Sequence, residues 1–159
     1  MTWVSFPDLN SGPAEVMFRL PASSGRTVAL EHFRQREGLA LLFLPDDDET
    51  RWLGALEMLA AAREALQQRD AAPLAVLPTT PDVAAGSARQ LTRPLLLLAD
   101  ADGRTRGRYL ALAPEIPPAT AFLFLLDRWG APLAAGTLDD DWIDEALAWF
   151  DLALARCPE

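Results

Sequence analysis

Residues 38–52 read Gly38-Leu-Ala-Leu-Leu-Phe-Leu-Pro45-Asp-Asp-Asp-Glu-Thr-Arg-Trp52. The apolar run 39–44, bounded by a glycine and a proline, is typical of a central strand that is covered on both faces. The acidic residues after it favour a helix start, because carboxylates stabilise the positive end of the helix dipole. We predict this helix over about residues 49–69, with Asp46 and Glu49 arranged as a capping box.

Alternating strand and helix patterns surround this segment. Strand patterns interrupted by Pro, Ser and Gly predict an N-terminal hairpin within residues 12–30. Further strands are predicted at 73–78, 95–98, 121–126 and 131–135, and further helices at 80–90, 104–110 and 139–156. This order predicts one α/β domain over residues 1–159, in which helices flank a central sheet.

Composition excludes several classes of function. The net charge is −9, and all 14 basic residues are arginine. Such a chain would repel a nucleic-acid backbone and offers no basic stripe for a membrane surface, so we expect neither partner. No apolar run approaches the length of a membrane span, and the N-terminus does not read as a secretion signal. We therefore expect a cytoplasmic protein.

Cysteine and histidine are each present once, as Cys157 and His32. An intramolecular disulfide and a Cys/His metal cluster are therefore excluded. His32 has no Gly-x-Ser-x-Gly motif to accompany it, so we interpret it as an ordinary partly buried or surface residue. Neither a cofactor nor a metal is expected.

Four phrases in order resemble the peroxiredoxin-like (alkyl hydroperoxide reductase/thiol-specific antioxidant) family of the thioredoxin fold. They are Gly12-Pro-Ala…Phe18-x-Leu20…Gly25-Arg-Thr-Val-Ala-Leu30, Ala40-Leu-Leu-Phe-Leu-Pro45, Leu96-Leu-Leu-Ala-Asp-Ala-Asp-Gly-Arg…Arg108-Tyr109 and Phe124-Leu-Leu-Asp-Arg-Trp-Gly130. The resemblance implies a thioredoxin-like three-layer sandwich: a central mixed sheet of about five strands, an N-terminal β-hairpin and flanking helices. For an intact member it also implies antioxidant thiol peroxidase activity.

The chain departs from the family at the reactive thiol. The family's active loop reads Pro-x-x-x-Thr/Ser-x-x-Cys, and counting from Pro45 puts Glu49 at the hydroxyl position and Trp52 at the cysteine position. Thr50 is one residue out of register, and no shift produces a cysteine. The acids Asp46, Asp47, Asp48 and Glu49 would raise the pKa of a thiol at this helix start.

A second supporting position of the family lies before the fourth strand. Its peroxidases carry an arginine there and its thiol reductases a cis-proline. Counting back from Asp127 places Ala121 at this position, with Pro117 and Pro118 a few residues earlier.

Our leading hypothesis is a peroxiredoxin-like protein that has lost thiol chemistry and acts as a binding or assembly module. The degenerate loop would contact an unidentified protein or small molecule, and a homodimer is compatible with the exposed edges and faces through which related folds pair. One alternative is a thiol-dependent peroxidase or disulfide oxidoreductase that uses Cys157, at the end of the last helix. Another is metal or anion binding, by the acids 46–49 or by Arg104, Arg106 and Arg108.

Overall fold

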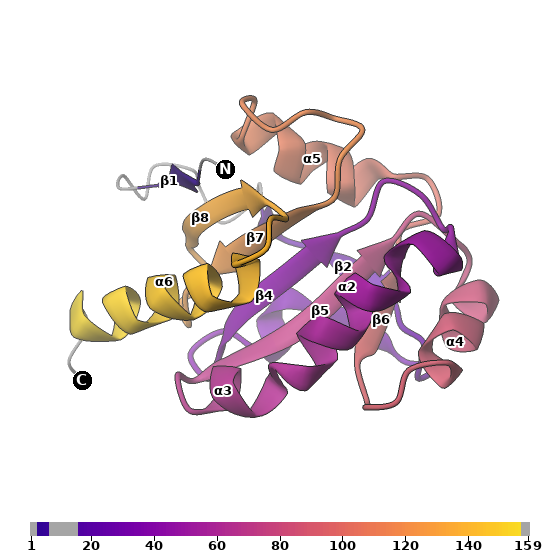
Figure 1. The fold of residues 1–159 in the computed structure, drawn as a ribbon, viewed down its shortest axis with the longest axis horizontal. Helices are drawn as coiled ribbons and strands as arrows, with labels where there is room; N and C mark the ends of the chain where they lie inside the picture. The colour runs from indigo at the N-terminus through magenta and orange to yellow at the C-terminus, as the bar shows by residue number, and fades with distance from the viewer. Residues whose placement is uncertain (1–2, 7–15, 157–159) are drawn as a thin grey trace.

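The computed structural model describes residues 3–6 and 16–156. Within these residues, six strands form one mixed sheet in the order β1-β8-β7-β4-β5-β6 (Figure 1). Their bounds are Val4–Ser5 for β1, Gly38–Phe43 for β4, Ala71–Leu77 for β5, Leu96–Ala99 for β6, Phe122–Leu126 for β7 and Pro132–Thr137 for β8. A separate antiparallel hairpin consists of β2 (Arg19–Pro21) and β3 (Thr27–Ala29).

Strand β4 lies in the interior of the sheet, as its sequence predicts. It runs parallel to β5 and antiparallel to β7, and all six of its residues are buried. Its side chains alternate between two cores, with Ala40 and Leu42 on one face and Leu39, Leu41 and Phe43 on the other. An uninterrupted apolar run is what a strand buried on both faces requires.

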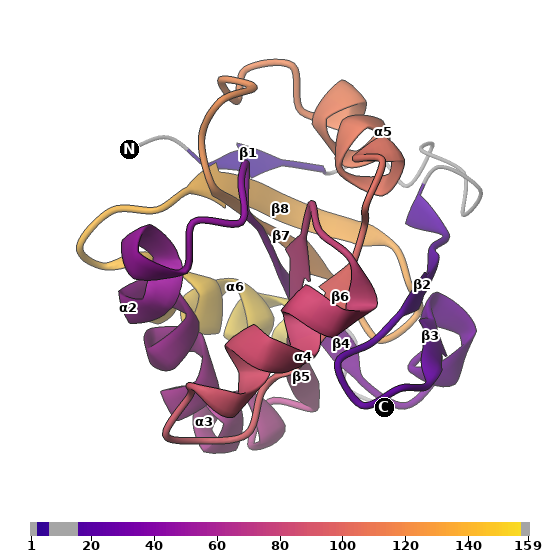
Figure 2. The same cartoon turned by 90° about the vertical axis from the view of Figure 1, so that its right-hand side faces the viewer.

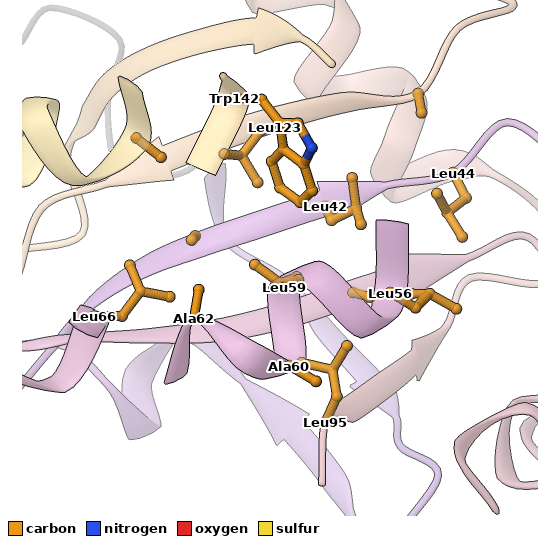
Figure 3. Packing of buried hydrophobic residues seen from close by; sticks show 14 of the residues in the cluster. Leu42, Leu44, Leu56, Leu59, Ala60, Ala62, Leu66, Leu95, Leu123 and Trp142 are labelled. Carbon is orange, nitrogen blue, oxygen red and sulfur yellow. The ribbon is translucent and has the colours of Figure 1, made fainter. Parts of the chain in front are cut away.

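Helices α2 (Glu49–Ala61), α3 (Arg63–Gln67), α4 (Pro81–Arg89) and α6 (Trp142–Arg156) contribute to the core on one face of the sheet (Figure 2). Leu56 and Leu59 of α2 approach Leu42 and Leu123 of the sheet, with Trp142 of α6 beside them (Figure 3). None of the helices within the described residues is long and apolar enough to cross a membrane.

The opposite face is covered by the hairpin, the short 3-10 helix η1 (Leu30–His32) and α5 (Arg104–Leu112). Tyr109 of α5 is fully buried, its ring packs edge-on against Phe124 at 4.8 Å between centroids, and its hydroxyl donates to the carbonyl of Val16. Burial raises the pKa of Tyr109, although Arg108 opposes the shift. Tyr109 therefore stays neutral and anchors the segment before the hairpin.

The predicted fold class is confirmed, and the described part of the N-terminal hairpin forms as expected. Thr80 caps α4 as predicted, since its side chain accepts the N–H of Val83 and Pro81 follows at the first helical position. The sheet also contains β1, a two-residue strand that pairs with β8. So short a strand carries no periodicity from which it could be predicted.

Three helix predictions need correction. The predicted helix 49–69 is two helices, because the N–H of Ala62 is shared between the carbonyls of Met58 and Leu59 and tightens the turn there. Helix α5 extends to Leu112, beyond the expected end at 110. Helix α6 begins at Trp142 and not at 139, since the Asp139 carboxylate accepts the N–H of Asp141 in a local turn.

Candidate functional site

The candidate site begins at the loop between β4 and α2. Asp48 is the N-cap of α2, and its carboxylate accepts the N–H of Arg51 at 3.3 Å. The predicted capping box of Asp46 and Glu49 is therefore wrong. Asp46 bonds instead to the N–H of Asp48 at 3.0 Å, which turns the chain before the helix starts.

Trp52 lies one turn into α2, half-buried, and its side chain is held by Asp46. The indole Nε1–H donates to Asp46 Oδ1 at 2.7 Å, while Arg51 Nη1 lies 3.3 Å from Asp46 Oδ2. The Arg51 guanidinium also lies over the Trp52 ring, 4.5 Å from its centroid. Asp46, Arg51 and Trp52 thus form one connected cluster at the start of α2.

The charge of Asp46 is stabilised by this cluster. Partial burial, the largest single influence, acts to raise the pKa of Asp46. The Asp48 amide, the Trp52 indole and the Arg51 charge together outweigh it, so the pKa is lowered. The carboxylate therefore remains ionised beside the N-terminus of α2, where it would disfavour a thiolate.

A groove of about 700 Å³ opens beside this cluster. Its volume falls within the range of about 300–1,000 Å³ found for ligand sites. Arg51 and Trp52 contribute from α2, Trp3 and Val4 from β1, and Thr137 and Leu138 from the end of β8 and the residue after it. The loop before β7 supplies the remaining side, through Glu115, Ile116, Pro117, Ala119, Thr120 and Ala121.

This loop is held in place by Arg106 of α5. Arg106 Nη2 donates to the carbonyl of Pro118 at 2.6 Å and to that of Thr120 at 2.7 Å. Burial lowers the pKa of Arg106, and the charge of Asp100 partly offsets this. A partly desolvated guanidinium bonded to two carbonyls fixes one side of the groove.

The position directly before β7 holds neither an arginine nor a proline. Ala121 occupies it, 5% exposed, and lines the groove. No cis peptide bond occurs among the described residues. Among the described residues, Arg51 is the one arginine that lines the groove, and its side chain is already paired with Asp46.

The remaining candidates of the loop are spread over its surface. Pro45 is half-buried, while Asp47, Asp48 and Thr50 are exposed; Glu49 begins α2. Thr79 Oγ1 lies 3.5 Å from Asp47 Oδ2. In the residues that the structure describes, no three acidic, His or Cys side chains are arranged to hold a metal ion.

The other predicted candidates do not converge on a site. Arg104 is 87% exposed and pairs with Asp102, and Arg108 is exposed, whereas Arg106 bonds to the loop before β7. His32 is exposed, as expected, and its Nδ1 accepts the N–H of Ala29 at 3.3 Å. Cys157 lies outside the described residues.

The mixed sheet with helices on both faces and a separate hairpin is a thioredoxin-like fold, similar to that of peroxiredoxins. No family model and no curated protein matches the sequence. Among solved structures, the chain is similar to peroxidoxin BcpB from Mycobacterium tuberculosis, with 18% identity over 86% of this chain and 92% of that one and a TM-score of 0.74.

Two further structures agree. The reduced 2-Cys peroxiredoxin of Plasmodium vivax has 17% identity, covers 90% of this chain and 95% of its own, and gives a TM-score of 0.75. Peroxiredoxin Q of Xanthomonas campestris has 16% identity, with 85% and 90% coverage and a TM-score of 0.74. The predicted resemblance is confirmed for the fold; identities this low establish the fold alone.

Proposed function

We propose that this protein is a binding module on a peroxiredoxin scaffold, and that thiol peroxidase chemistry has been lost from it. The ligand would lie in the groove beside Trp52. The observation that carries the proposal is that Trp52, which counting from Pro45 aligns with the family's thiol position, lines a groove large enough for a small molecule.

The lining favours an uncharged, apolar ligand. Trp3, Trp52, Ile116 and Leu138 supply apolar surface, whereas the charged residues are Arg51 and Glu115. Arg51 is engaged by Asp46 and by the Trp52 ring, so little positive charge remains to select an anion. An apolar molecule would gain roughly 25 cal/mol for each Å² of apolar surface removed from water.

Peroxide consumption tests the loss of catalysis. With hydrogen peroxide and dithiothreitol, we expect turnover no faster than that of the reductant alone, because the loop offers no thiol. Replacing Cys157→Ser should change nothing. Turnover that is abolished in the Cys157→Ser variant would establish the alternative, an enzyme that uses Cys157. Turnover that survives the substitution would equally contradict the proposal.

Octanol tests the groove directly. The chain has five tryptophans, which give separate indole signals in a ¹⁵N–¹H NMR spectrum. We expect octanol to shift the Trp52 and Trp3 signals and to saturate, and Leu138→Asp to weaken binding about tenfold by placing a charge at a half-buried position of the apolar lining. In the loop before β7, the Thr120 hydroxyl donates a hydrogen bond to the carbonyl of Pro117. Unchanged amide signals from this loop would show that the variant keeps its fold. Octanol that leaves both indole signals unmoved would refute an apolar site here.

The homodimer and the cytoplasmic location stay predictions from the sequence. Sedimentation at several protein concentrations would decide the first. The apolar groove residues would be the surface to examine if a dimer is found.

A further inference from the structure

A second pocket, of about 250 Å³, lies at the opposite end of the sheet. It is bordered by Gly38 at the start of β4, by the turn between β7 and β8, and by the last two turns of α6. The groove, in contrast, contacts the residues before β7 and the end of β8. None of the described residues lines both the groove and this pocket, so the two sites are separate.

The floor of this pocket is apolar. It consists of Phe6, Pro132, Leu133, Phe150 and Leu154. Trp129 stands at the rim and is 46% exposed, a large exposure for an indole ring that has apolar neighbours. The apolar part of a small ligand could therefore contact both the floor residues and the Trp129 ring.

Arginines from three parts of the chain line this pocket, although the chain is acidic overall. Arg69 follows α3, Arg128 belongs to the turn after β7, and Arg156 ends α6, so three elements bring guanidinium groups to one pocket. The Arg128 guanidinium lies 4.8 Å from the centroid of the Trp129 ring. Two aspartates, Asp70 and Asp127, also line the pocket, against a net charge of −9 for the whole chain.

Hydrogen bonds within the protein engage one of these carboxylates and one of these arginines. Asp127 Oδ1 accepts the N–H of Trp129 at 2.9 Å and that of Ala131 at 3.0 Å, so it serves the turn itself. Arg69 pairs with Asp151 at 2.9 Å and donates to Ala65 O at 2.8 Å, which fixes its direction. Because Asp151 already pairs with Arg69, the proposed anion contact is assigned to Arg128 and Arg156.

We propose that this pocket binds a small amphipathic carboxylate, with its apolar body on the Phe150 floor and its carboxylate at the arginine rim. Guanidinium groups match the geometry of a carboxylate and bind it more strongly than a neutral donor does. The volume is below that of drug-sized ligand sites, so a single short chain or ring fits it best. This proposal is independent of the one for the groove.

Octanoate is the probe for this site, and octanol is its neutral match. In a titration of ¹⁵N-labelled protein, octanoate should shift the Trp129 indole signal, which Trp129→Phe identifies by its disappearance. We expect octanol to act on this signal at least about fivefold more weakly, since it lacks the charge that the rim recognises. Raising NaCl to 1 M should weaken octanoate binding, because salt screens a partly exposed pair.

Arg128→Gln and Arg156→Gln should each weaken octanoate binding about fivefold, while leaving the amide spectrum of the sheet unchanged. Arg104→Gln is the matched control: it makes the same change of charge at an arginine that is 87% exposed and lines neither site. Equal effects of octanol and octanoate, or unchanged affinity in both variants, would overturn the proposal. So would an octanoate shift confined to Trp52 and Trp3, which would place the carboxylate in the groove.

Discussion

Replacing Gly38→Ala is expected to lower the free energy of unfolding by about 2–4 kcal/mol. A Cβ at this position would lie 2.7 Å from the carbonyl oxygen of Leu126 and 3.0 Å from Cε1 of Phe150. The first contact is with backbone that belongs to β7, next to β4, so it cannot be relieved by rotating a side chain. Urea unfolding followed by circular dichroism measures the change.

Gly54→Ala is the matched control for this substitution. Gly54 lies exposed within α2, and a Cβ there would meet nothing within 4 Å. Alanine should therefore raise the free energy of unfolding by about 0.5–1 kcal/mol through helix propensity. If both substitutions stabilised the protein, the close approach of β4, β7 and Phe150 at Gly38 would be disproved.

The central part of the fold could be predicted because its signals are local. A short apolar run bounded by glycine and proline favours a strand buried on both faces, and the side chains of β4 and β7 do alternate between the two cores. Thr80 and Pro81 fix the start of α4 by short-range chemistry. The break at Ala62 could not be predicted, because the apolar periodicity runs through it unchanged.

The candidate site could be predicted only in part. The position of Trp52 follows from counting along one loop, and the structure places it in a groove. The groove itself depends on Trp3 and on residues 115–121, which are remote from Trp52 in sequence. The sequence suggests Arg106 as an anion ligand together with Arg104 and Arg108, yet its side chain bonds to the loop before β7. These segments become neighbours only in the folded structure, so the sequence alone does not reveal the groove.

Arg106→Met is expected to lower the free energy of unfolding by about 2 kcal/mol, because two charge-assisted hydrogen bonds are lost. The cost of partly burying the guanidinium is removed at the same time, which keeps the loss below the sum of the two bonds. Thermal and urea unfolding would measure it. Arg104→Met, at an arginine that is 87% exposed, should leave the stability unchanged.

Arg106→Lys separates the charge of Arg106 from its geometry. An ammonium keeps the charge but lacks the planar group with which Arg106 reaches both Pro118 and Thr120. We therefore expect Arg106→Lys to lose most of the stability that Arg106→Met loses. Both variants should also weaken octanol binding at the Trp52 indole, because one side of the groove is then no longer held. Full binding with reduced stability would mean that Arg106 supports the fold but not the groove.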